Sequence, residues 1–133
     1  MLKLEIVTPE AKTYSDDVEM VTLPAVEGEM GVFPQHVPLV TQIVAGEIIV
    51  RKGNQESFLA VGEGFVEITA NRVAIMTDMA IAAENIDEAQ AEEARRRAEA
   101  RLAERIDDTE AAAVSASLAH SLAQLKVKRR QRH

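Results

Sequence analysis

Residues 58–77 read FLAVGEGFVEITANRVAIMT, and this stretch decides the fold class. Three short runs rich in β-branched and aromatic residues follow one another, separated by Gly62-Glu63-Gly64 and by Ala70-Asn71. Such runs with turn residues between them are typical of antiparallel strands in a sandwich or barrel. The pattern extends toward the N-terminus through further runs at 2–7, 18–23 and 47–52. Residues 1–84 are therefore predicted to form an all-β sandwich or barrel.

The strand runs also predict which side chains face the core. In the run 18–23, alternation places Val18 and Met20 on one face and Glu19 and Val21 on the other. Gly53-Asn54 and Ala70-Asn71 have the composition of hairpin tips.

The chain changes character after Glu84, where glycine and proline disappear and alanine dominates. Asn85 is expected to cap a helix, with Glu88 completing a capping box. A break at 106–109 separates two apolar stripes with helical spacing. These stripes consist of Ala91, Ala94, Ala98, Leu102 and Ile106, and of Ala111, Val114, Leu118, Leu122 and Leu125. Residues 85–133 are therefore predicted to form an antiparallel helical hairpin as a second domain.

Composition narrows the classes of function for the 133 residues. The chain has no cysteine, which excludes disulfides, thiolate nucleophiles and cysteine-ligated zinc. The net charge of −7 divides into −8 for residues 1–84 and +1 for 85–133, where KVKRRQRH ends the chain. The acidic first part disfavours nucleic acid, while the basic tail suits an acidic partner. No apolar run is long enough to span a bilayer, so membrane association is expected only through partners.

Motifs for catalysis or metal binding are not evident. His36, His120 and His133 have no metal-ligand spacing, and Gly62-Glu63-Gly64 is more simply a turn than a dinucleotide loop. The pair Asp16-Asp17 is more simply an exposed acidic turn before a strand than a cation site. No metal and no catalytic residue are expected. An enzyme using Asp16, Asp17 and His36 would require these side chains to converge.

The stretch 28–39, GEMGVFPQHVPL, places apolar residues among two glycines and two prolines. Glycine and proline at this density disfavour regular structure and move a segment to the surface. Two interpretations remain: the segment covers the core with its own apolar side chains, or it offers them to a partner. His36 either caps a turn through a nearby backbone group or belongs to an interface.

Taken together, these segments make the chain resemble the epsilon subunit of bacterial and plastid rotary ATP synthases. The residues that carry the resemblance are LEIVTPE, DDVEMVTLPAVEGEMGVFPQHVPLV, GEGFVEI and IDEAQAEEARRRAEARL, with the stretch 28–39 the most specific. The resemblance implies a β sandwich of about ten short strands in residues 1–84, followed by the helical hairpin. It also implies a non-catalytic rotor subunit of the central stalk. Its partners would be the gamma subunit, the proton-carrying ring and, through the helices, the catalytic alpha and beta subunits. It also implies that the helices can extend and impede ATP hydrolysis.

The resemblance further implies roles for particular residues. Phe33 would anchor the segment 28–39 into the sandwich, while its neighbours would face the proton-carrying ring: Glu29, Met30, Val32 and His36. The basic tail would meet acidic segments of the beta subunits through Lys126, Lys128, Arg129, Arg130 and Arg132. Some members bind ATP between the helices through a motif matched here by Ile86, Asp87 and Ala91. Gln90 replaces its arginine, and His120 and Gln124 replace further arginines, so ATP binding is expected to be weak or absent.

The expected location follows from these partners: the cytoplasmic face of a bacterial inner membrane, with the plastid thylakoid less favoured. The alternative is a free-standing β-sandwich adaptor with a helical hairpin, unrelated to ATP synthase. Such an adaptor would purify alone or with other proteins, but not with a gamma subunit.

Overall fold

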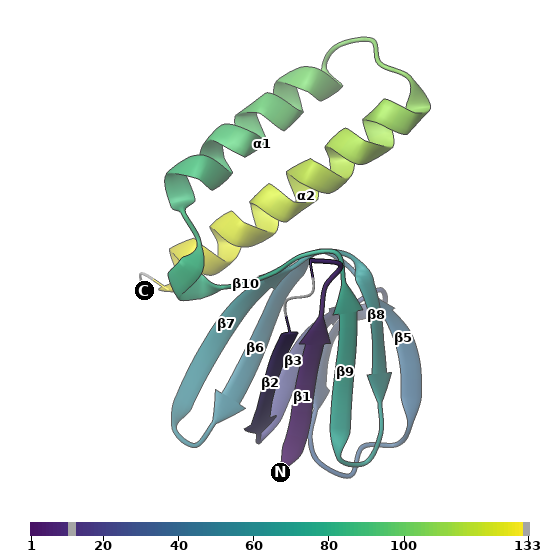
Figure 1. The fold of residues 1–133 in the computed structure, drawn as a ribbon, viewed down its shortest axis with the longest axis vertical. Helices are drawn as coiled ribbons and strands as arrows, with labels where there is room; N and C mark the ends of the chain where they lie inside the picture. The colour runs from purple at the N-terminus through teal and green to yellow at the C-terminus, as the bar shows by residue number, and fades with distance from the viewer. Residues whose placement is uncertain (11–12, 132–133) are drawn as a thin grey trace.

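The computed structural model describes residues 1–10 and 13–131, which form a strand-rich body with two helices packed at one end (Figure 1). This architecture confirms the predicted sandwich followed by a helical hairpin. The strands are β1 (Leu2–Val7), β2 (Thr13–Val18), β3 (Met20–Ala25), β4 (Gly28–Val32), β5 (Leu39–Ile43), β6 (Gly46–Lys52), β7 (Gln55–Val61), β8 (Gly64–Ile68), β9 (Arg72–Thr77) and β10 (Ala80–Ala82). A 3₁₀ turn, η1 (Ala83–Asn85), leads to α1 (Glu88–Leu102) and α2 (Asp108–Gln131).

The strands form one continuous sheet that folds over on itself. Their order is β10-β7-β6-β3-β5-β8-β9-β1-β2, and β4 pairs with β3. β1 and β9 run parallel, whereas the other pairs are antiparallel. A single residue pair, Ala25 opposite Ile43, joins β3 to β5. The sheet turns at this narrow junction, so β10, β7, β6 and β3 form one layer and β5, β8, β9, β1 and β2 form the other.

The sandwich core is aliphatic and follows from strand alternation. Leu2, Leu4 and Ile6 of β1 point inward, as Val73 and Ile75 of β9 do. All five belong to one buried cluster that contains no helix residue. Burial of these side chains contributes about 1.5–3 kcal/mol each before the entropy of ordering is counted. The sandwich therefore has a core that is independent of the helices.

The run 18–23 is not one strand, which corrects the predicted alternation. β2 ends at Val18 and β3 begins at Met20, and both Val18 and Val21 are fully buried. The break at Glu19 changes which face points inward. The expectation that Val18 and Val21 lie on opposite faces is therefore wrong, because both side chains point into the core. The acidic turn expected at Asp16-Asp17 is also wrong, because both residues belong to β2 and pair with β1.

The hairpin tips are where the sequence places them. Lys52 pairs with Gln55 across Gly53-Asn54, and Gly53 has a φ of +65°, a left-handed conformation that glycine adopts without strain. Ile68 pairs with Val73 across the tip that contains Ala70 and Asn71.

The helix caps differ in part from the prediction. α1 is capped by Asp87, whose carboxylate accepts a hydrogen bond from the Gln90 backbone N–H at 3.1 Å. Asn85 belongs to η1 instead, because the chain stays irregular long enough to bury Ile86 beneath α2. Asp107 accepts from the Glu110 backbone N–H at 2.7 Å, as expected for the start of the second helix.

α2 is the helix that attaches the hairpin to the sandwich. It lies along the sandwich end and contacts β7 and β6, and α1 packs on it from outside (Figure 1). Ala123 and Val127 of α2 form a second buried cluster with Ala60, Ala83 and Ile86. The prediction that Leu122 belongs to the buried stripe is wrong, because its side chain is exposed. One face of α2 packs on α1 and a second face packs on the sheet, and Leu122 lies on neither.

Candidate functional site

The segment 28–39 spans the length of the sandwich: β4 begins at the end nearer the helices, and the turn after it lies at the opposite end. β4 pairs with β3, and the turn after it contacts the tip between β8 and β9, where the Gln35 N–H donates to the Ala70 carbonyl at 2.5 Å. That tip lies at the end of the sandwich away from α1 and α2 (Figure 1). Glu29 is exposed and His36 is partly exposed. His36 Nδ1 lies 2.6 Å from the Val37 carbonyl oxygen, as the turn-capping interpretation expects.

Three side chains in this segment have the opposite placement to the one expected. Met30, expected to face a partner, packs against the buried core. Val32 is completely buried opposite Val21, so it cannot face a partner while the sandwich is folded. Phe33 is 52% exposed and does not anchor the segment. The reason is that residues 28–32 form a strand rather than a loop, and alternation turns Met30 and Val32 inward. The apolar side chains available to a partner are Phe33 and Val37, the latter 75% exposed.

A second exposed apolar feature crosses the outer face of the sheet. Val7 lies opposite Met76, and Met76 lies opposite Phe65, so the three side chains form a row over β1, β9 and β8. Each is about half-exposed. We call this row the apolar ridge. Exposed apolar surface that is contiguous in this way is a feature of interaction sites.

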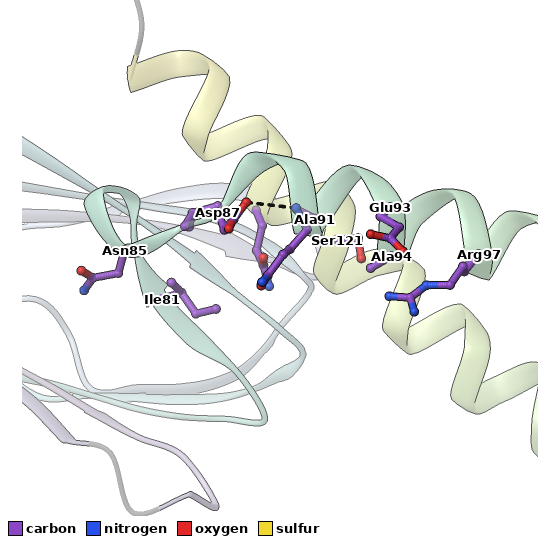
Figure 2. A pocket seen from close by; sticks show the side chains of 11 residues that line it. Ile81, Asn85, Asp87, Ala91, Glu93, Ala94, Arg97 and Ser121 are labelled. Carbon is purple, nitrogen blue, oxygen red and sulfur yellow. Dashed lines mark hydrogen bonds between the residues drawn. The ribbon is translucent and has the colours of Figure 1, made fainter.

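The ATP-motif positions come together at a hollow between the helices. Ile86, Asp87, Gln90 and Ala91 line a cavity of about 510 Å³ with residues of α1, α2 and β10 (Figure 2). Among the described residues that line it, Arg97 provides the positive charge, and Glu93 lies one turn away on the same helix. The Asp87 carboxylate is already used as the helix cap. Gln124 lines the cavity, whereas His120 is bonded to the sandwich.

The described part of the basic tail is bound within the chain. Lys128 Nζ donates to the Ala83 carbonyl at 3.2 Å, and Arg129 contacts Glu88 at 3.3 Å and Glu92 at 3.0 Å. Arg130 Nε lies 3.2 Å from Glu47 Oε1. Lys126 is exposed, and Arg132 lies outside the described residues.

Arg129 also belongs to the contact between the two helices. It shares Glu92 with Arg95, and these two arginines, Arg95 first, lower the pKa of Glu92 to about 2. At the far end of the hairpin, Arg101 pairs with Glu104 and Glu110 across the turn. The two helices are thus joined by charge at both ends of an alanine-rich seam.

Glu47 is a buried carboxylate beneath the end of α2. Its side chain is 4% exposed, on the face of β6 that α2 covers. Burial raises its pKa, although the charges of Arg130 and Lys126 oppose the shift. Arg130 also stacks over the Phe58 ring, 5.6 Å from its centroid. Glu47 Oε2 is buried and has no hydrogen-bond partner among the described residues, so Arg130 is its main compensation.

The acidic pair and His36 do not form a shared site in the described chain. Asp16 accepts from Lys52 Nζ at 2.9 Å, and this contact lowers the pKa of Asp16. His36 contacts the Val37 carbonyl oxygen instead, and residues 1–10 and 13–131 contain no cluster of three potential metal ligands.

Comparison with known protein families accounts for both parts of the chain. Residues 1–83 match the family described as ATP synthase, Delta/Epsilon chain, beta-sandwich domain. Residues 84–129 match the ATP synthase, Delta/Epsilon chain, long alpha-helix domain. The chain belongs to the ATP synthase delta/epsilon family. The resemblance stated from the sequence is thereby confirmed.

Individual relatives agree with this family assignment over nearly the full chain. The ATP synthase epsilon chain of Dehalococcoides mccartyi is 42% identical over 132 residues, covering 98% of this chain and 94% of the relative. That of Chromobacterium violaceum is 41% identical over 127 residues, covering 94% and 91%. A chain in a mitochondrial ATP synthase structure from Euglena gracilis shares the fold, with a TM-score of 0.74 at 24% identity, covering 94% of this chain and 79% of that one.

Two features of this delta/epsilon family member are not found by reading its sequence for motifs. Glu47 sits in a strand among aliphatic residues, and Asp78 follows β9 with no obvious partner. The signal for both is on α2, where His120, Ala123, Val127 and Arg130 have the spacing of one helix face. The described helices include none long and apolar enough to cross a membrane.

Proposed function

We propose that this chain is a non-catalytic rotor subunit of the central stalk of a proton-translocating ATP synthase. It would couple the proton-carrying ring and the gamma subunit to the catalytic ring, and its helices would inhibit ATP hydrolysis when they leave the sandwich. The observation that carries the proposal is the match of both domains, in order, to the delta/epsilon family. Chains with the same fold occur in an OSCP/F1/c-ring assembly and in a central stalk/c-ring assembly, and this agrees with the proposed place in a rotor.

The surface we assign to the proton-carrying ring is the exposed side of β4 and the turn after it, with Glu29, Phe33 and His36. It combines an exposed carboxylate with exposed apolar side chains. The turn lies opposite the helices, whereas Glu29 lies at the other end of β4, opposite Pro24. Mixed polar and apolar contact suits a joint that transmits torque. Val32 is excluded from this surface by its burial.

Charge reversal at Glu29 and His36 is expected to weaken the coupling between ATP hydrolysis and proton pumping. In membranes carrying Glu29→Lys with His36→Asp, ATP-driven proton pumping should fall by about half or more while ATP hydrolysis continues, because unfavourable charges at a contact weaken it. The measurement is the ratio of pumping to hydrolysis. Glu84→Lys, an exposed change beside the helices, is the matched control. Equal ratios in all three membranes would contradict the assignment.

The apolar ridge is the surface we assign to the gamma subunit. The ridge is a continuous exposed row of Val7, Phe65 and Met76. A partner subunit would cover such a row in an assembly. Copurification distinguishes this from the adaptor alternative: a rotor subunit carries gamma with it, and an adaptor does not. The location proposed for the chain, at the cytoplasmic face of a bacterial membrane, depends on these partners.

The basic tail supports inhibition only in an undocked hairpin. Lys128, Arg129 and Arg130 are all engaged within the chain in this structure. They would reach acidic segments of the catalytic subunits by exchanging these internal contacts for external ones. The structure therefore corresponds to the non-inhibiting arrangement of this proposal.

ATP binding by the hollow is expected to be weak, with a dissociation constant above about 1 mM. Gln90 cannot supply a charge-assisted bond to phosphate, and Arg97 faces the cavity beside the carboxylate of Glu93. Gln90→Arg should tighten binding by about tenfold. Calorimetry on the purified chain measures both. Tight ATP binding by the unmodified chain would overturn this expectation.

A further inference from the structure

Three segments converge on a contact in the middle of α2. His120 Nε2 of α2 lies 3.1 Å from Asp78 Oδ2, in the connection between β9 and β10. Gly62, between β7 and β8, lies directly beside both groups. A Cβ added at Gly62 would come within 1.8 Å of Asp78 Oδ1 and 2.6 Å of His120 Nε2. The contact is thus packed against the backbone of a third segment rather than formed by free surface side chains.

This contact is one of the few polar connections between the helical hairpin and the sandwich. Other polar contacts are made by Gln124 Nε2, 3.9 Å from Met79 Sδ, and at the end of α2, where Arg130 meets Glu47 and Lys128 meets the Ala83 carbonyl. The apolar part of the interface relies on small side chains such as Ala60 and Ala123, which bury little area. Polar contacts therefore have a large share in deciding whether α2 stays docked.

Charged groups lie around His120 on the elements that pack near it. Asp78 is its direct partner, and Glu63 lines the same hollow as Asp78 on the neighbouring connection. On α2 itself no charged residue occurs within four positions of His120. α1 contributes Glu93 and Arg97, which line the cavity beside Ser121 and Gln124.

We infer that His120 and Asp78 form a proton-dependent clasp, which holds α2 on the sandwich more tightly at acidic than at alkaline pH. A neutral imidazole still donates one hydrogen bond to the carboxylate, but an imidazolium adds charge to that bond. Histidine changes charge between about pH 5 and 8, so the clasp responds in the range where cells work. The inference rests on the proposed function only for its consequence: alkaline conditions would release the helices toward their inhibiting position.

Thiol labelling tests the clasp in the purified chain, independently of any ATP synthase. The chain has no cysteine, so one introduced thiol is the only target. Ala123 is buried between docked α2 and the sheet, so the thiol of Ala123→Cys would be protected, whereas that of Ala112→Cys on the same helix would be exposed. The ratio of their labelling rates reports undocking and cancels the pH dependence of thiol chemistry. From about pH 5.5 to about pH 8 the ratio should rise by about two- to fivefold, the range of a partly exposed ion pair.

Variants of the clasp separate it from the other titrating contact. All variants are made in the Glu47→Gln chain, which removes the other titrating contact. In that chain His120→Gln and Asp78→Asn should each give a ratio that does not change with pH, and His120→Lys should give a low ratio at every pH. Gly62→Ala should remove the pH response by displacing both groups while leaving the charges in the chain. A response that persists in His120→Gln with Glu47→Gln, or that is abolished by Glu47→Gln alone, would overturn the inference, as would a flat ratio in the unmodified chain.

Hydrogen exchange provides a second reading if Ala123→Cys disturbs packing. Protection of the Val127 backbone N–H, in the buried part of α2, is measured in the cysteine-free chain. Its opening constant, corrected for intrinsic exchange, should rise with pH in the Glu47→Gln chain and should lose that rise when His120→Gln is added. If the labelling and exchange experiments contradicted the clasp but the chain still bound gamma, the proposed rotor function would stand. The clasp and the rotor function are therefore tested separately.

Discussion

Val32→Asp is expected to lower the free energy of unfolding of the sandwich by about 4 kcal/mol or more. Val32 is completely buried opposite Val21, and an aspartate there would place a carboxylate in an aliphatic core without a partner. The measurement is urea denaturation of the purified chain, followed by circular dichroism at a β-sheet wavelength. A variant too unstable to purify folded agrees with the same expectation.

Val37→Asp is the matched control, five residues along the same segment. Its side chain is 75% exposed, so the change should alter the free energy of unfolding by no more than about 0.5 kcal/mol. If Val32→Asp were as mild as Val37→Asp, Val32 would have to face outward, as a surface residue of the ring-facing end. That outcome would agree with the expectation from the sequence that Val32 faces the proton-carrying ring.

Arg130→Ala is expected to increase undocking of the end of α2 by about thirtyfold at neutral pH, equivalent to about 2 kcal/mol. The substitution removes the partner of Glu47 and leaves that carboxylate buried and uncompensated. Hydrogen exchange of the Val127 backbone N–H measures the change. Arg129→Ala is the control, because Arg129 pairs with α1 rather than with the sandwich.

The pH dependence of Arg130→Ala gives the sign of the Glu47 contribution. Burial raises the pKa of Glu47, so the docked chain holds this proton more tightly than the undocked chain. The contribution to docking is fully present below the ordinary pKa of a glutamate and is lost as pH rises through the raised value. Arg130 opposes the raised pKa, so its removal should widen this window. Adding Glu47→Gln should restore docking to within a few-fold of the unmodified chain, and a double variant as loose as Arg130→Ala would contradict this role.

The strand body could be predicted because its signal is local. In β1, β8 and β9, alternation and short turns fix both the strands and their inward faces. The break at Glu19 could not be predicted in this way, because it depends on β3 pairing with β4 and β6 rather than continuing β2. The cap at Asp87 likewise depends on the burial of Ile86 by α2, since Asn85 is an equally good cap in isolation.

The segment 28–39 shows how composition can mislead. Its glycines and prolines suggested an irregular loop, yet Met30 and Val32 alternate as in any half-buried strand, and both prolines come after the strand ends. The family resemblance assigns roles to the side chains of this segment but does not give the direction of each side chain. Direction follows from pairing with β3, which turns Val32 into the core and leaves Phe33 outside.

The contacts of α2 required the tertiary structure. The sequence shows one apolar stripe, but α2 has a second buried face with polar side chains at both ends, His120 and Arg130. Their partners, Asp78 and Glu47, are 42 and 83 positions away along the sequence. The basic tail was assigned to an external partner from its charge, and its internal partners became visible only once the helix was placed on the sheet.

ATP hydrolysis by synthase complexes tests the central claim, that the sandwich assembles the rotor and the helices restrain hydrolysis. Complexes are rebuilt with the full chain or with a chain ending after Glu84, which retains the entire sandwich core. If the account is right, both chains assemble with gamma and the truncated chain gives the faster hydrolysis. Equal rates in assembled complexes would contradict the inhibitory role of the helices, and failure of both chains to assemble would contradict the rotor function itself.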